Sequence, residues 1–173
     1  MILGNGDIKE YLEQGKLGII PLSEDTIREN GVDLRIGDEI IRFADMGSTI
    51  KISDKDAVAA ISKKEKVSGS FVLNANEKIL VKIKERVKMP NDIIGFCNLR
   101  STFARLGISI PPTIVDAGYG GDLTIGVSGG AVPIEIEVGT RFLHLVFSTT
   151  RSEVKGAYSG KYQNSDGAVG AKV

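Results

Sequence analysis

The chain has 173 residues, 42% of them hydrophobic, which predicts one domain with a sizeable core. Its 22 basic and 22 acidic side chains cancel, so no overall field favours nucleic acid or an anionic membrane. No apolar run approaches the roughly 20 residues of a membrane helix, the polar start is unlike a signal peptide, and the single cysteine, Cys97, fits a reducing cytoplasm.

The N-terminal segment is the one part of the chain predicted to be helical. Asp7 is the expected N-cap, Glu10 completes a capping box three residues later, and Gly15 is expected to end the helix. The spacing of its apolar side chains places them on one face of the helix. The residues expected on that face are Ile8, Tyr11 and Leu12.

After this helix the hydrophobic pattern has a period of two, which is typical of strands. It is clearest in KILVKIK (78–84), PIEIEVG (133–139) and RFLHLVF (141–147). Short strands punctuated by 21 glycines predict an all-β fold, an antiparallel sandwich or jelly-roll barrel. No repeat or linker divides residues 1–157. The tail, 158–173, is rich in Gly and Ser, so it is either disordered or a flap that orders over a ligand.

Several kinds of chemistry are excluded by residue counts. One His and one Cys cannot form a His/Cys/Cys zinc site, and the CxxC pair of zinc deaminases is absent. No GxxxxGK[ST] loop is present, and GYGG at 118–121 is not a GxGxxG fingerprint. His144 lies between two leucines in a predicted strand, so we expect a packed or interfacial side chain.

The stretch from Leu99 to Val127 carries the chemistry that remains. It begins with an Arg-Ser-Thr loop at 100–102, and guanidinium forks and hydroxyls match phosphate oxygens. Asp116 follows in a glycine-containing turn, where a carboxylate can orient a water. Together these features predict a site for a nucleoside triphosphate.

Five segments, in order, resemble the superfamily of the trimeric dUTP diphosphatases and the related dCTP deaminases. The resemblance covers most of the chain. The segments are NGVDLRIG (30–37), LRSTFARLGI (99–108), VDAGYGGDLTI (115–125), VPIEIEVGTRFLHLVF (132–147) and YSGKYQNSDG (158–167).

This resemblance implies a distorted jelly roll that assembles as a homotrimer, with active sites at subunit interfaces and the tail closing over the nucleotide. It implies that Asp116 is the catalytic base and that Asp33 has a supporting role. Mg²⁺ would be held mainly by substrate phosphates and water, so no protein ligand cluster is expected. The expected phosphate-binding residues are Arg100, Ser101, Thr102, Arg105 (toward a neighbouring subunit's ligand), Lys161 and Gln163. The expected nucleoside-binding residues are Thr113, Val115, Tyr119 and Tyr162.

One position departs from the deaminase branch. Deaminases of this type place a glutamate ten residues after the motif Asp, and Gly126 stands there in this chain. Gly126 shares a strand face with Thr124 and Ser128, the face that lines the nucleotide pocket in this family. Glu135 and Glu137 are predicted to point to solvent from a later strand.

The resemblance leaves alternatives open at single residues. Asp116 could be an Asx-turn residue, Arg100 could form a structural ion pair with Asp116, and Asp33 could only brace the phosphate segment through Arg35 or a backbone amide. Tyr119 could be ordinary core packing. For the whole chain, dUTP diphosphatase is favoured, a dCTP deaminase with or without diphosphatase activity is the alternative, and a non-enzymatic deoxynucleotide-binding module is the third possibility.

Overall fold

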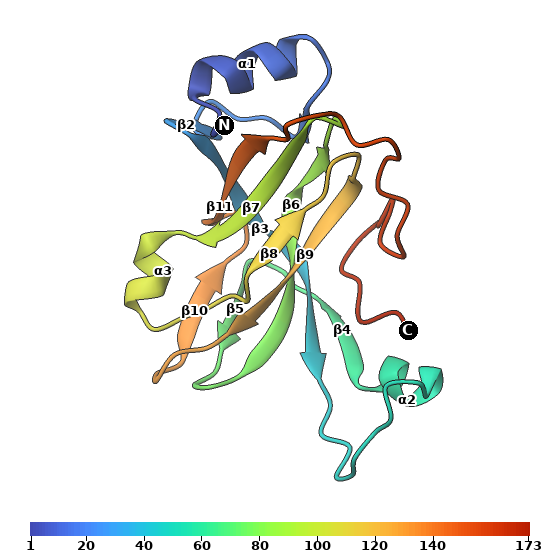
Figure 1. The fold of residues 1–173 in the computed structure, drawn as a ribbon. Helices are drawn as coiled ribbons and strands as arrows, with labels where there is room; N and C mark the ends of the chain where they lie inside the picture. The colour runs from blue at the N-terminus through green and yellow to red at the C-terminus, as the bar shows by residue number, and fades with distance from the viewer.

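Antiparallel pairing between distant strands builds the fold, which we describe from a computed structural model that covers residues 1–173. A nine-stranded sheet curls on itself, and β5 and β10 form a small second sheet (Figure 1). This confirms the predicted all-β jelly-roll fold. The strands are β1 (Gly18–Ile20), β2 (Ile27–Arg28), β3 (Gly31–Phe43), β4 (Ser62–Lys66), β5 (Ser70–Leu73), β6 (Lys78–Lys88), β7 (Ile93–Leu99), β8 (Thr113–Val115), β9 (Gly120–Ser128), β10 (Ile134–Glu137) and β11 (Arg141–Thr149).

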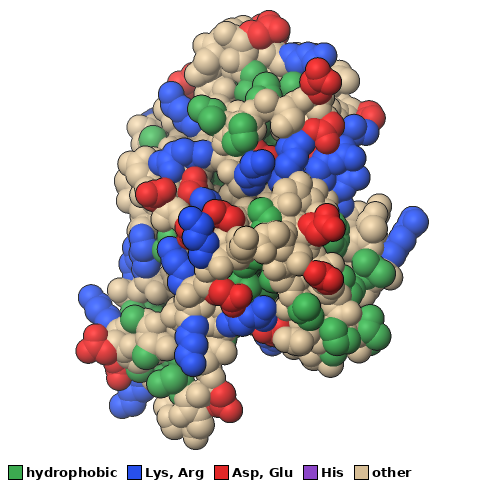
Figure 2. All heavy atoms as spheres, turned by 180° about the vertical axis from the view of Figure 1, so that it is seen from behind, with side chains coloured by type: hydrophobic (Ala, Val, Ile, Leu, Met, Phe, Trp, Pro, Cys, Tyr) green, Lys and Arg blue, Asp and Glu red, His purple; other side chains and the backbone are tan.

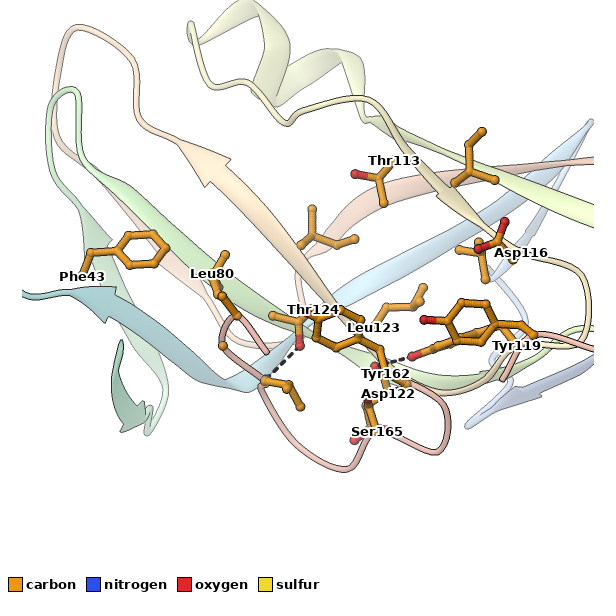
Figure 3. Close-up of a pocket in the computed structure, with 17 residues that line it drawn as sticks. Phe43, Leu80, Thr113, Asp116, Tyr119, Asp122, Leu123, Thr124, Tyr162 and Ser165 are labelled. Atoms are coloured by element: carbon orange, nitrogen blue, oxygen red, sulfur yellow. Dashed lines mark hydrogen bonds between the residues drawn. The ribbon is translucent and has the colours of Figure 1, made fainter. Parts of the chain in front are cut away.

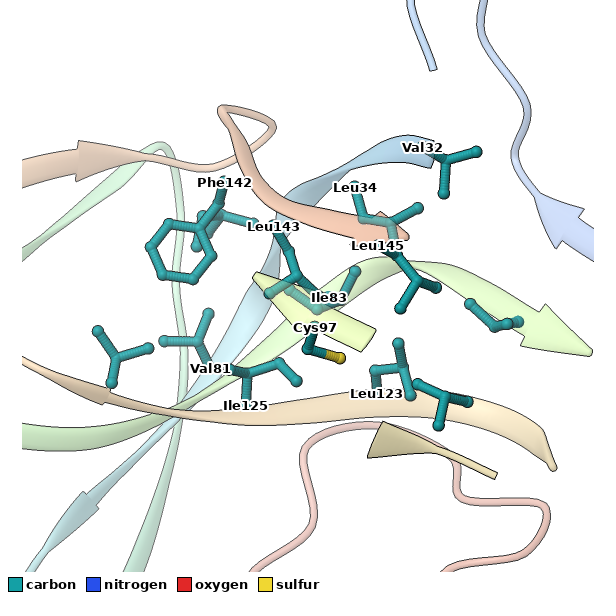
Figure 4. Close-up of a cluster of buried hydrophobic side chains, with 14 of the residues drawn as sticks. Val32, Leu34, Val81, Ile83, Cys97, Leu123, Ile125, Phe142, Leu143 and Leu145 are labelled. Atoms are coloured by element: carbon teal, nitrogen blue, oxygen red, sulfur yellow. The ribbon is translucent and has the colours of Figure 1, made fainter. Parts of the chain in front are cut away.

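Strand β6 organises one half of the sheet, because it pairs with β1, β3 and β9. Its side chains alternate as predicted: Ile79, Val81 and Ile83 are buried, whereas Lys84 is exposed. These side chains meet those of β9 and β11 in the cluster of Figure 4. The period-two pattern therefore identified the inner face of this strand correctly.

Strand β11 joins the two halves, since it pairs with β3 on one side and β7 on the other. Leu143, Leu145 and Phe147 are fully buried, as predicted. Phe142, on the opposite face, is also fully buried and packs edge-on against Phe103 at a centroid distance of 4.9 Å. Both faces of β11 are thus covered where it begins.

The predicted N-terminal helix exists as α1 (Asn5–Glu13), but its cap differs. Gly4 is the N-cap and Asp7 lies in the first turn, where its carboxylate accepts the Gly4 N–H at 3.0 Å. Asp7 therefore plays the part predicted for Glu10, because the helix starts earlier than expected. Gly15 follows the helix end with φ +67°, as expected for a helix stop.

Two further helices contradict the prediction of a single helical segment. They are α2 (Lys55–Ala60), capped by the Asp54 carboxylate on the Ala57 N–H, and α3 (Ser101–Arg105). Each has at most six residues, too few for a helical period to stand out. None of the three helices is long and apolar enough to cross a membrane. Figure 2 shows basic and acidic side chains interspersed over one face of the molecule.

The tail, predicted to be either disordered or a flap, packs on the barrel. Ser165, Gly167 and Ala168 are buried, and Gly121 forms an isolated bridge with Ser165. In Figure 1 the tail runs along the side of the barrel opposite α3.

Candidate functional site

A tight turn between β8 and β9 places Asp116 at the mouth of a cavity. The Asp116 carbonyl accepts the Tyr119 N–H at 3.1 Å, and Gly118 has φ +81°. A Cβ at Gly118 would also lie 2.6 Å from the Cβ of Ala157, so only glycine fits. The Asp116 side chain is exposed and makes no hydrogen bond or ion pair within the chain. It pairs neither with Arg100 nor with its own turn, so its carboxylate is free to act on a ligand.

The cavity beside Asp116 has a volume of about 390 Å³ and is mainly apolar, within the size range of small-molecule sites. Asp116 and Tyr119 lie at one end, and Phe43 and Leu80 at the other (Figure 3). All four predicted nucleoside-binding residues line it. They are Thr113, Val115, Tyr119 and Tyr162.

Tyr119 forms a rigid wall of this cavity. Its hydroxyl donates to the Asp122 carbonyl at 2.8 Å, and its ring packs edge-on against Tyr158 at 5.7 Å. Burial raises the pKa of the Tyr119 phenol, so the hydroxyl stays protonated. Tyr119 is therefore both a packed residue and a cavity wall.

The tail supplies the opposite wall and is held by side chains of the barrel. The Asp122 carboxylate accepts the Gly167 N–H at 2.9 Å, Glu39 accepts that of Ala168 at 2.8 Å, and the Thr124 hydroxyl accepts that of Val169 at 3.1 Å. Figure 3 shows the last of these bonds below Thr124. The Ala168 N–H lowers the pKa of Glu39, so the carboxylate form is the one that holds the tail.

Of the strand face predicted to line the pocket, Thr124 does so, whereas Gly126 and Ser128 do not. Leu123 and Ile125, on the inner face, also reach the cavity. Gly126 lies beside the cavity residue Leu80, and a Cβ there would be 3.5 Å from Pro111, an ordinary contact. Position 126 thus has room for a side chain but carries none.

The two later glutamates do not replace that side chain. Glu135 and Glu137 are exposed on β10, as predicted, and neither lines the cavity. Glu135 accepts a hydrogen bond from the Ser70 hydroxyl on the neighbouring strand β5. Asp122 is the second carboxylate of the cavity, and it is engaged with Lys82, Arg86 and the tail. Asp116 is therefore the cavity's one carboxylate without a protein partner.

The predicted phosphate residues of the Arg-Ser-Thr segment lie elsewhere on the chain. Arg100 and Ser101 border a shallow depression of about 300 Å³ that shares no residue with the cavity. Thr102 and Arg105 are exposed on α3, which Figure 1 places on the far side of the barrel from the tail. One chain therefore does not bring these residues to Asp116.

Asp33 anchors this second group. It is only 1% exposed and forms an ion pair with Arg100, and its Oδ1 lies 2.9 Å from Nδ1 of His144. Asp33 thus contacts the Arg-Ser-Thr segment through the Arg100 side chain, and not through Arg35 or a backbone amide as the alternative had it. Arg35 instead pairs with the buried Glu85 and with Asp25. Burial, together with Arg141 and Arg28, lowers the pKa of Arg100.

The tail residues predicted to bind phosphate have other contacts. The Gln163 amide forms hydrogen bonds at both ends with the turn between β8 and β9. Its oxygen accepts the Gly120 N–H at 2.9 Å, and its nitrogen donates to the Gly118 carbonyl at 3.0 Å. Gln163 therefore fastens the tail to this turn, and one N–H of its amide is left for a ligand. Lys161 is exposed, and its ammonium donates to the Lys172 carbonyl at 3.4 Å.

Several residues at these sites escaped the sequence analysis. Asp122 is one whose signal was present, because it shares the alternating face of Thr124. Glu39 had no such signal, because its partner Ala168 is 129 residues away. Arg28 had none because it lies just outside the motif segment 30–37, although its partner Asp33 is near in the sequence. No group of three or more His, Cys, Asp or Glu side chains could hold a metal ion by itself. The donor set is thus compatible with an ion carried by a polyphosphate.

Comparison with known proteins places these features in a family. A profile described as dCTP deaminase-like matches residues 2–150. A protein of Sulfolobus islandicus rod-shaped virus 1, named probable deoxyuridine 5'-triphosphate nucleotidohydrolase, is 49% identical over 172 residues and covers 99% of both chains. The dCTP deaminase of Acidianus ambivalens is 51% identical over 170 residues, covering 98% of this chain and 96% of its own.

A solved structure agrees at the level of the fold. The 2'-deoxycytidine 5'-triphosphate deaminase from Agrobacterium tumefaciens superposes with a TM-score of 0.67 at 23% identity, over 84% of this chain and 46% of that chain. With the profile match over most of the chain and relatives near 50% identity, the chain belongs to the dCTP deaminase-like family of enzymes.

Proposed function

We propose that this protein is a dUTP diphosphatase, which hydrolyses dUTP to dUMP and pyrophosphate with Mg²⁺. One observation carries the proposal: the cavity holds one carboxylate without a protein partner, Asp116, and Gly126 offers no acid on the strand where deaminases of this type carry a glutamate. That set of groups supports activation of one water and lacks the acid that deamination needs. The viral relative named probable deoxyuridine 5'-triphosphate nucleotidohydrolase is consistent with it.

In the proposed reaction Asp116 orients a water and takes its proton while the oxygen attacks the α-phosphorus in line. A P–O bond forms, the bond from the α-phosphorus to the bridging oxygen breaks, and pyrophosphate leaves. The exposed Asp116 side chain can reach water from solvent, and a carboxylate in that position can act as a general base. Mg²⁺ bound to the phosphates would neutralise their charge.

Tyr119 is the proposed wall beneath the deoxyribose. The residue is only 7% exposed, and its side chain is fixed by the hydrogen bond to the Asp122 carbonyl and by the contact with Tyr158. A wall held from two sides cannot move aside for a 2′-hydroxyl, which favours dUTP over UTP. Tyr162 would cover the nucleoside from the tail side.

The phosphate groups of the substrate are proposed to meet Arg100, Ser101, Thr102 and Arg105 of a neighbouring copy in a homotrimer. The supporting observation is that these side chains lie away from Asp116 within one chain. The protein is then expected to sediment as a trimer. A monomer with full activity would contradict the composite site.

A dCTP deaminase remains the second candidate, because relatives about 50% identical carry that name. In that reaction water replaces the amino group at C4 of cytosine and ammonia leaves. Purified protein should be incubated with Mg²⁺ and either dUTP or dCTP, with pyrophosphate and ammonia measured separately. Pyrophosphate from dUTP without ammonia from dCTP supports the proposal, comparable ammonia release overturns it, and neither product would indicate a non-enzymatic binding module.

A further inference from the structure

His144 is the only histidine of the chain, and its ring borders the depression formed by Arg100 and Ser101. The residue lies on β11 opposite Asp33 of β3, and Nδ1 is 2.9 Å from the Asp33 Oδ1. The side chain is 26% exposed, so the ring reaches both the buried carboxylate and the open depression.

Several charged side chains lie around His144 and its partner Asp33. Asp33 on β3 is the common partner of Arg100, of Arg141 on β11 (3.6 Å) and of Arg28 on β2 (3.9 Å). Glu29, also at the depression, is exposed and lies 3.7 Å from Arg28. The buried carboxylate therefore organises three guanidinium groups, and His144 is its one partner that can change charge near neutral pH.

The fold reserves space for the ring. A Cβ at Gly31 would lie 2.8 Å from the His144 Nε2 and 2.6 Å from the Leu145 carbonyl oxygen. Because a carboxylate only accepts hydrogen bonds, the Nδ1 atom facing Asp33 carries the proton. In the neutral ring Nε2 then has no proton, and it is the atom that a second proton would occupy.

The surroundings favour the neutral ring while the depression is empty of anions. Burial lowers the pKa of His144, and the positive charges of Arg100 and Arg28 lower it further, while Glu29 opposes them. A phosphate bound by Arg100 and Arg28 would offset those two positive charges. The imidazolium form would then become more favourable, without any change in burial.

We propose that His144 is a positioning residue of the phosphate site: through Asp33 it holds Arg100 in place, and it takes up one proton from solvent when the site binds a phosphate anion. This inference rests on the proposed function for the role of Arg100 and Ser101. It adds that binding of a phosphate anion is coupled to the uptake of one proton by His144. Affinity for the anion then strengthens as the pH falls through the pKa of the anion-bound ring, and levels off below that of the free ring.

The single histidine makes the test direct. The ring signals of His144 are followed by NMR across a pH titration, without and with inorganic pyrophosphate. We expect a higher midpoint with pyrophosphate. Calorimetry in two buffers of different ionisation enthalpy should show uptake of up to one proton per site between the two midpoints.

Two variants separate positioning from a merely structural role. His144→Asn retains an N–H for Asp33 but cannot be protonated. Pyrophosphate affinity of the unmodified protein should therefore rise more steeply on acidification than that of the variant, by up to about tenfold per pH unit. Arg100→Gln keeps the histidine and removes one of the two neighbouring cations. The titration midpoint of His144 should therefore rise in the free protein and respond less to pyrophosphate. Lys63→Gln removes an exposed charge on β4 and should leave both midpoints unchanged.

The outcomes distinguish this inference from the proposed function. If pyrophosphate binds and the histidine midpoint does not move, the inference is wrong, whereas dUTP hydrolysis can still be observed. If the midpoint moves and dUTP is not hydrolysed, the proposed function is wrong and the proton linkage stands. If pyrophosphate does not bind at millimolar concentration, the linkage and the phosphate site are both refuted.

Discussion

Replacing Asp116 by Asn tests the proposed reaction most directly. The amide keeps the size of the side chain and removes its basicity. Loss of a positioned general base typically lowers turnover about 10²- to 10⁴-fold, or about 3–5 kcal/mol in activation free energy. The carboxylate is exposed and has no partner, so the free energy of unfolding should change by less than about 0.5 kcal/mol.

The assay is pyrophosphate release from dUTP with Mg²⁺, combined with equilibrium binding of dUTP. Asp122→Asn is the matched control, since it alters the other carboxylate of the cavity. That carboxylate holds the Gly167 N–H and faces Lys82 and Arg86, so the change should destabilise the protein by about 1–3 kcal/mol. An Asp116→Asn variant that retains a third or more of the normal rate would refute the role of Asp116 as base.

Three further outcomes are expected. The unmodified protein should release no ammonia from dCTP above background. The Gly126→Glu variant, for which the structure has room for a Cβ, should show a trace of deamination. Ammonia release by the unmodified protein at a rate comparable to its dUTP hydrolysis would refute the assignment. Truncation before Tyr158 should leave the barrel folded by circular dichroism and strongly reduce turnover, because the tail forms one wall of the cavity; an unchanged rate would show that the tail has no part in the reaction. The stability that the Glu39–Ala168 hydrogen bond contributes should be fully present above the pKa of the Glu39 carboxyl in the unfolded chain, and it should be lost as the pH falls through the lower pKa of that carboxyl in the folded protein. Glu39→Gln should therefore weaken the dependence of the free energy of unfolding on acid pH, measured by urea unfolding. Identical curves for the two proteins would argue against the anchor.

The local pattern of the sequence was sufficient for the long strands β6, β9 and β11, for β10, and for several of the residues that line the cavity beside Asp116. Alternation is a property of each strand by itself, so the inner faces of β6 and β9 could be assigned without knowing their neighbours. The turn that presents Asp116 is also local, because Gly118, two residues after Asp116, adopts the positive φ that forms it. The short helices α2 and α3 were missed because one turn and a half carries too little periodicity.

The partners of these side chains depended on the tertiary structure. His144 and Asp33 are 111 residues apart and meet only because β11 and β3 pair in one particular register. Likewise, Glu39 reaches Ala168 across 129 residues once the tail is packed on the barrel. A contact of this kind is set by how whole strands align, and a shift of one residue would turn each side chain to the opposite face. The sequence therefore determined the strand faces and the candidate residues, and only the fold decided which of those residues contact one another.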